Sequence, residues 1–246
     1  GDRRSSLYVN NNGNVTFDNP MGTFTPFGLT TDIGRPVIAP FFADVDTRTG
    51  NLTKYGQGMV DGHNAFGVTW VDVGYFSQRQ DKLNTFQLII IDRSDRGDGD
   101  FDIEFNYTKV QWETGEASGG VDGFGGHPVH AGFSNGTGEP GTFYEFEGSG
   151  VSGYMLDSSP NGLIHSSRKS SLNGRYIFHV VAGRPELDYG SGVYIGNDSV
   201  LDQWDSVNEV WKVSDPNDYH NLSEDPLFIN GYLLSQMRAG QAIDSK

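Results

Sequence analysis

The pattern that most restricts the fold is a strict alternation of apolar and polar residues over positions 101–107. Every odd position of FDIEFNY is apolar or aromatic, and every even position is polar. Successive side chains of a β-strand point to opposite faces, so a period of two predicts a strand with one face in a core. The β-branched and apolar run 85–91 precedes it, and the turn-forming stretch 92–100 joins the two. Together they predict an antiparallel hairpin with a long acidic loop.

Similar short runs occur along most of the chain. They predict strands at residues 6–9, 14–17, 37–45, 65–71, 129–134, 143–146 and 175–181. The content of 16 Phe and 11 Tyr favours strands over helices, and 34 glycines supply turns. The prediction is a mostly β fold, a sandwich of antiparallel sheets with long loops rich in Gly and Asp.

The composition changes after residue 184. We therefore divide the chain into a β domain, 1–184, and an acidic C-terminal extension, 185–246, which carries eleven acidic and three basic residues. Helical spacing predicts two short helices in the extension, one after Ser199 and one after Pro226. Their apolar residues are too many to leave in water, so we expect the extension to dock on the β domain. Docking on a second copy, or a linker role, are the alternatives. The apolar residues are Leu201, Trp204, Trp211, Leu227, Phe228, Leu233, Leu234 and Met237.

Charge and composition exclude several classes of function. The formal net charge of −15 repels phosphate backbones, so nucleic acid is not expected as a partner. No apolar run approaches the ~20 residues of a membrane span, so no membrane insertion is expected. The absence of cysteine excludes disulfides, thiolate metal sites and cysteine nucleophiles.

Two short motifs resemble catalytic or metal sites. Ser134 lies in a G-x-S-x-G sequence, but the glycines and Pro140 that follow prevent the helix that a nucleophile elbow needs. His127 and His130 are three residues apart, but Pro128 prevents a helix from placing both on one face. We therefore predict no catalytic residue and no zinc site here.

Two clusters of carboxylates are candidates for calcium, which binds about six to eight oxygens. One is the acidic loop 92–102, with Asp92, Asp95, Asp98, Asp100 and Asp102. Arg96 breaks the EF-hand pattern there, so a solvated hairpin tip is the alternative. The other cluster is Asp44 and Asp46, placed to share one face of a strand. The alternative for this pair is that both accept hydrogen bonds from backbone amides.

Five blocks of sequence, in order, resemble one known family. They are VIAPFFADVDTR (37–48), KLNTFQLIIID (82–92), FNYTKVQWETGEASGG (105–120), HAGFSNGTG (130–138) and NGRYIFHV (173–180). The chain from about residue 7 to 181 is similar to the NIDO (nidogen-like extracellular) domain, in the version found on bacterial secreted and surface proteins. The resemblance ends before the C-terminal extension.

The resemblance implies an extracellular, non-enzymatic module. Such a module serves adhesion or scaffolding within a larger surface or matrix protein and binds a protein or glycan partner. Six N-x-[ST] sequons, at Asn14, Asn51, Asn106, Asn135, Asn197 and Asn221, fit an extracellular location. The Gly-rich loop 112–126 is a candidate recognition surface, with a purely structural loop as its alternative. The alternative function is a secreted β-sandwich hydrolase that uses paired carboxylates.

Overall fold

The structure is a computed structural model that describes residues 4–186, 193–195, 201–205 and 210–213. The internal contacts of the chain divide it into two compact units, Gly1–Gly183 and Arg184–Lys246. We describe each unit by itself.

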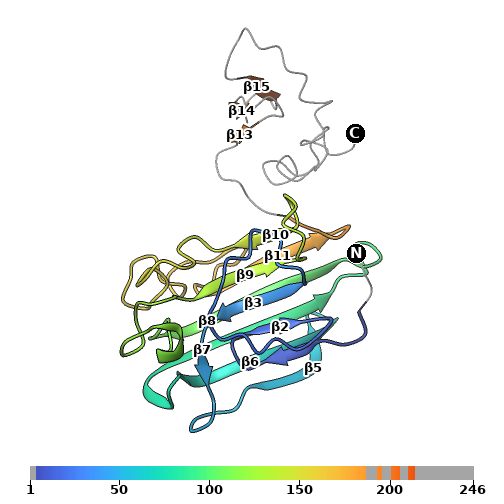
Figure 1. Cartoon of the computed structure of the whole chain (residues 1–246). Helices are drawn as coiled ribbons and strands as arrows, with labels where there is room; N and C mark the ends of the chain where they lie inside the picture. The colour runs from blue at the N-terminus through green and yellow to red at the C-terminus, as the bar shows by residue number, and fades with distance from the viewer. Residues whose placement is uncertain (1–3, 187–192, 196–200, 206–209, 214–246) are drawn as a thin grey trace. The chain divides into compact units, whose positions relative to one another are not determined.

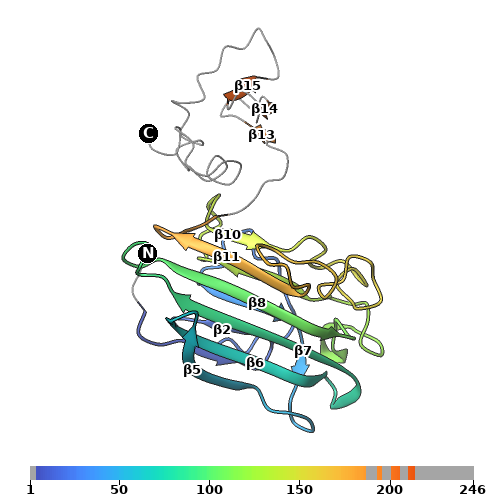
Figure 2. The same cartoon turned by 180° about the vertical axis from the view of Figure 1, so that it is seen from behind.

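Two antiparallel sheets dominate the described chain, which confirms the mostly β prediction (Figures 1 and 2). The five-stranded sheet is in front in Figure 1, and the larger sheet is in front in Figure 2, which is turned by 180°. The order of the five-stranded sheet is β1 (Tyr8–Asn10), β2 (Asn14–Thr16), β3 (Val37–Phe42), β9 (His130–Ser134) and β10 (Phe143–Glu145). The order of the seven-stranded sheet is β12 (Arg184–Pro185), β11 (Arg175–Val181), β8 (Phe101–Val110), β7 (Arg79–Asp92), β6 (His63–Tyr75) and β4 (Val45–Asp46), with β5 (Lys54–Val60) also paired to β6.

Aromatic side chains fill the space between the sheets. Phe41 of β3 lies 5.1 Å from Phe86 of β7 and 5.6 Å from Trp112, measured between ring centroids. At the other side of the core, Phe133 of β9 packs edge-on against Phe178 of β11 at 5.1 Å. Interlocked rings of this kind contribute beyond their buried area, so they fix the two sheets face to face.

Strand β3 is buried on both faces, which accounts for its unbroken apolar sequence. Phe41 faces the aromatic core, whereas Ala39 and Phe42 belong to a second cluster with Met21 and Leu29. Residues of the loop before β3 therefore cover the outer face of the five-stranded sheet. A strand covered on both sides reads as a continuous apolar run rather than an alternating one.

The strand predicted over 37–45 is interrupted, and this part of the prediction is wrong. β3 ends at Phe42 in the five-stranded sheet, and the chain resumes at Val45 as β4 in the seven-stranded sheet. Ala43 and Asp44 form the crossover, with a hydrogen bond from the Val45 amide to the Ala43 carbonyl. The apolar residues of β3 continue through Ala43 to Val45 and hid the crossover, because periodicity alone does not mark a change of sheet.

In the second unit, the helix predicted after Ser199 is wrong. The described residues form a three-stranded antiparallel sheet of β13 (Val193–Ile195), β14 (Leu201–Asp205) and β15 (Val210–Val213). Trp204 and Trp211 are register partners across β14 and β15. Trp and Val favour strands, and this preference outweighs the helical spacing. The helix predicted after Pro226 lies outside the described residues. Among the described residues, no helix has the length and apolar character needed to cross a membrane.

Candidate functional site

Asp44 lies in the crossover and holds a nearby loop. Its side chain is 4% exposed and accepts hydrogen bonds from the amides of Ala117 and Ser118. Its second carboxylate oxygen is buried and has no hydrogen-bond partner among the described residues. Burial, with a smaller contribution from the charge of Asp46, raises the pKa of Asp44 to about 6. A side chain at Gly115 would collide with Asp44, because an added Cβ would lie 2.4 Å from its oxygen.

Asp46, at the end of β4, is held by an arginine and by backbone amides. Arg48 donates to both carboxylate oxygens, with Nε at 2.9 and 3.1 Å. The amides of Arg48 and Gln78 donate to it at 3.0 and 2.9 Å. The Arg48 hydrogen bond lowers the pKa of Asp46 to about 2, although burial opposes this. Both carboxylates thus accept hydrogen bonds from backbone amides, as the alternative to a calcium site expected.

The acidic loop between β7 and β8 is also held by partners within the chain. Asp92 accepts the Ser94 amide at 3.0 Å, and Asp95 pairs with Arg93 at 2.9 Å. Asp100 is buried and accepts the Ala182 amide at 2.9 Å. Asp98 is exposed at the tip of the loop. The loop joins β7 and β8 as a hairpin, which confirms the sequence prediction for these strands.

Asp102 on β8, which the sequence placed among the aspartates of the acidic loop, is the centre of a buried ion cluster. It accepts hydrogen bonds from Arg93 at 2.9 Å, Arg96 at 2.5 Å and His179 at 2.7 Å. Burial acts to raise the pKa of Asp102, but the hydrogen bonds from these three residues outweigh it and lower the pKa to about 2. The polar face of β8 at Asp102 is therefore covered by arginine and histidine side chains and not left to solvent.

No group of three or more His, Asp and Glu side chains in the described part of the chain is arranged to hold a metal ion. Most of the candidate carboxylates instead have arginine, histidine or amide partners. Calcium binding at Asp44, Asp46, Asp92, Asp95, Asp98 and Asp100 stays a prediction.

Ser134 and the histidines form no catalytic arrangement in the contacts of the described residues. Ser134 is buried at the end of β9, and its hydroxyl accepts the Gly136 amide at 3.0 Å. His130 instead contacts Glu145 of β10, with 2.7 Å between the ring nitrogen and the carboxylate oxygen. The carboxylate of Glu145 also accepts the Leu29 amide at 3.0 Å, so this pair ties the N-terminal loop to the sheet.

The Gly-rich loop has a buried base and an exposed tip. Glu113 at the base is fully buried and accepts hydrogen bonds from the Gly125 amide, the Ser152 hydroxyl and the Gly153 amide. Sequence reasoning missed Glu113. The only available signal was a carboxylate directly after a core tryptophan. Because the carboxylate has three donors, it fixes the loop from within.

The tip of this loop is a tight hairpin that presents two apolar side chains. The amides and carbonyls of Val121 and Phe124 hydrogen-bond each other at 2.9 and 3.1 Å. The Gly123 carbonyl accepts the amides of Glu113 and Thr114, which anchors the tip to the buried base. Val121 is 73% exposed and Phe124 is 37% exposed. The use of this tip as a recognition surface stays a prediction, with a purely structural loop as its alternative.

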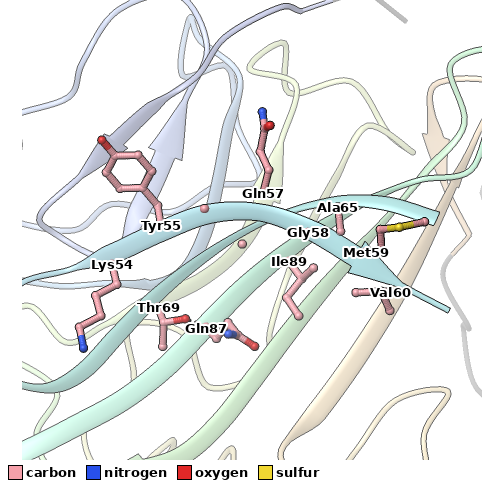
Figure 3. A pocket seen from close by; sticks show the side chains of 12 residues that line it. Lys54, Tyr55, Gln57, Gly58, Met59, Val60, Ala65, Thr69, Gln87 and Ile89 are labelled. Carbon is pink, nitrogen blue, oxygen red and sulfur yellow. Dashed lines mark hydrogen bonds between the residues drawn. The ribbon is translucent and has the colours of Figure 1, made fainter. Parts of the chain in front are cut away.

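A second surface lies on the outer face of the seven-stranded sheet. A hydrogen-bonded row crosses it from Thr69 through Gln87 and Asn106 to Glu104, which pairs with Arg175. Beside this row, a shallow groove of about 290 Å³ follows β5, β6 and β7 (Figure 3). Lys54, Thr69, Gln87 and Ile89 point to the groove side of β5, whereas Tyr55 and Gln57 point to the other side.

Burial limits which sequons are accessible. Asn14 is fully buried and is hydrogen-bonded to Asn10 at 2.8 Å, so it is not a glycan acceptor in the folded chain. Asn106 is half-buried within the polar row, whereas Asn51 and Asn135 are exposed. Asn197 and Asn221 lie outside the described residues.

Comparison with known proteins gives one family and several relatives. A family model described as "Nidogen-like domain" matches residues 5–59 and 53–182. Alpha-tectorin of Mus musculus is 33% identical over 156 residues, covering 53% of this chain and 7% of alpha-tectorin. Nidogen of Drosophila melanogaster is 29% identical over 178 residues, covering 61% of this chain and 12% of nidogen. The chain thus corresponds to a small part of each relative. No solved structure gives a significant match.

Proposed function

Because the chain belongs to the nidogen-like domain family, we propose that it is an extracellular adhesion or scaffolding module that binds a protein or glycan partner. The observation that carries the proposal is the family match, which extends over nearly the whole β domain. The relatives are many times longer than this chain, so we place the module within a larger surface or matrix protein.

The tip of the Gly-rich loop is the surface that best fits a binding function. Val121 and Phe124 are exposed apolar residues on a hairpin whose base is fixed by Glu113. Lys82 lies 5.2 Å from the Phe124 ring, so the tip also carries a cation beside an aromatic face. A rigid aromatic anchor loses little conformational entropy on binding, and such residues dominate the energy of many interfaces.

The environment of the candidate catalytic residues supports a non-enzymatic role. The hydrolase alternative needs two accessible carboxylates, yet Asp44 and Asp46 are both buried and hydrogen-bonded. Ser134 is buried as well, and its hydroxyl contacts the Gly136 amide. These placements give a substrate no access to the residues that would act on it.

Retention on defined surfaces tests this function directly. The probes are a glycan array and a decellularised tissue matrix, each incubated with the purified 246-residue chain. We expect saturable binding to at least one surface, with the bound glycans recovered intact. Cleavage of an arrayed glycan would favour the hydrolase, and the absence of saturable binding on both surfaces would reject the binding function.

Calcium stabilisation remains part of the proposal and has its own test. It is supported by the density of aspartates in the β7–β8 loop, where Asp92, Asp95 and Asp98 are exposed. An ion that binds only the folded state raises the melting temperature. We therefore expect excess chelator to lower the melting temperature of the native protein and metal analysis to find calcium. An unchanged melting temperature in chelator, together with no bound calcium, would show that calcium does not stabilise this fold.

A further inference from the structure

Strand β5 forms the longest open sheet edge among the described residues. One side of β5 pairs with β6 over seven residues, from Lys54↔Thr69 to Val60↔His63. In the part of the chain that the structure describes, no strand pairs with the other side. The remaining edge strands of the described residues are shorter, with two to four residues each: β1, β10, β4, β12, β13 and β15. Proteins usually shorten, charge or cover such edges, because unpaired amides and carbonyls recruit another strand.

The turn that joins β5 to β6 determines which backbone groups face the open edge. Asp61 and Gly62 have φ angles of 50° and 85°, as in a two-residue hairpin loop. The flanking residues Val60 and His63 then form a hydrogen-bonded pair, and the pattern alternates along the strand. The amides and carbonyls of Tyr55, Gln57 and Met59 therefore point away from β6, toward the open edge.

The side chains at this edge are apolar and carry little charge. Tyr55 is 71% exposed and Met59 is 68% exposed, although both lie on the sheet face that includes buried Val68 and Trp70. Residues 49–60 contain one lysine and no acidic residue, in a chain of net charge −15. Electrostatic repulsion between two copies of the chain is therefore weak along this edge.

The edge is also complementary to itself. If two copies pair antiparallel about a two-fold axis at Gln57, Tyr55 of each copy lies opposite Met59 of the other. Gly56 then lies opposite Gly58, and an added Cβ at either glycine meets no atom within 4 Å in the single chain. Aromatic and thioether side chains form favourable pairs, and cross-strand pairs of this kind stabilise sheets.

We propose that β5 pairs antiparallel with β5 of a second copy of this chain, joining the two larger sheets into one continuous sheet. This inference does not rest on the proposed function, because it follows from the geometry of the edge. Stable complexes bury ~1,200–2,000 Å² of surface, and pairing along one seven-residue strand buries less than this. The dimer is therefore weak, and its population depends on concentration.

A single cysteine provides the first test, since the native chain has none. Hydrogen-bonded antiparallel partners have Cα atoms about 5.5 Å apart, within the range that a disulfide spans. We expect the Gln57→Cys variant to form a covalent dimer at least about tenfold faster than the Leu172→Cys variant. Leu172 is a matched control because it is 61% exposed and lies outside the strands. Equal rates for the two variants would overturn the proposal.

Opposite charges at the same position test the two-fold register without a covalent bond. Sedimentation equilibrium of the full chain is expected to show a dimer that forms with increasing concentration. The Gln57→Lys and Gln57→Glu variants each place like charges opposite each other, so each alone associates about threefold or more weakly. An equimolar mixture of the two recovers association at low salt. A monomer at every concentration overturns the proposal, also where another segment of the chain is what covers β5. A mixture of the two variants that associates no more strongly than either variant alone overturns it as well.

Discussion

Asp44 is a buried carboxylate whose charged form the fold disfavours. Burial raises its pKa from 3.8 to about 6, so the folded state holds this proton more tightly than the unfolded chain. Asp44 therefore makes the free energy of unfolding fall as pH rises from about 4 to about 6. The Asp44→Asn variant lacks this fall. Urea unfolding measures the difference in unfolding free energy between this variant and the wild type. We expect that difference to shift by about 1–3 kcal/mol in favour of the variant as pH rises from about 4 to about 7.

The Asp44→Ala variant is the control for the hydrogen bonds that Asp44 accepts. Alanine removes the titrating carboxyl as asparagine does, but it also leaves the Ala117 amide without its acceptor. We therefore expect the Asp44→Ala variant to be about 1–3 kcal/mol less stable than the Asp44→Asn variant at every pH. A difference between the Asp44→Asn variant and the wild type that stays constant with pH would contradict the role given to burial.

At the scale of elements, the β7–β8 hairpin and β11 are joined by the ion cluster at Asp102. We expect the Asp102→Asn variant to lose about 2–4 kcal/mol of unfolding free energy at neutral pH, because Arg93, Arg96 and His179 lose their shared anion. The pKa of Asp102 is lowered to about 2, so its contribution is present above about pH 4 and is lost as pH falls through about 2. Denaturant unfolding measures both effects.

The Asp95→Asn variant is the matched control on the same loop. Asp95 also pairs with Arg93, but its side chain is exposed. Exposed ion pairs contribute little to stability, so this variant should unfold nearly as the wild type does. Equal destabilisation by both variants would mean that the loop, and not the buried cluster, joins the strands.

The sequence predicted the elements whose side chains follow one simple pattern. The alternation over 101–107 identified β8, and the hairpin with β7 followed from the turn residues between them. The same alternation did not show that the polar face would be covered, because Arg93, Arg96 and His179 come from other positions in the chain. Contacts between distant segments leave no local periodicity.

Elements with a mixed or weak pattern were missed or misassigned. Strand β5 was missed because its residues, KYGQGMV, are nearly all exposed and include two glycines. The Asp61-Gly62 turn after it was the local signal that could have found it. β14 was predicted as helix from the cap residue Ser199 and the spacing of Leu201, Trp204 and Trp211. Asp44 and Asp46 were recognised as unusual, but the crossover that separates them was not.

At the scale of the whole molecule, the association of the C-terminal extension with the β domain stays a prediction. The extension contains many apolar residues, and burying them at ~25 cal/mol per Å² is the physical reason to expect docking. We expect limited proteolysis of the full chain to cut after about residue 185 only slowly. Rapid loss of the extension, leaving a compact β domain with an unchanged melting temperature, would show that the extension is a linker.

We propose that the chain binds its partner through the exposed tip of its Gly-rich loop. Equilibrium binding of the full chain to decellularised matrix, compared between two variants of equal thermal stability, tests it most directly. We expect the double variant Val121→Asp with Phe124→Asp to bind at least about tenfold more weakly, because two apolar anchors are lost. Leu172→Asp, at an exposed apolar residue elsewhere, should leave binding unchanged. Unchanged binding by the loop variant, or equal loss in both variants, would contradict the claim.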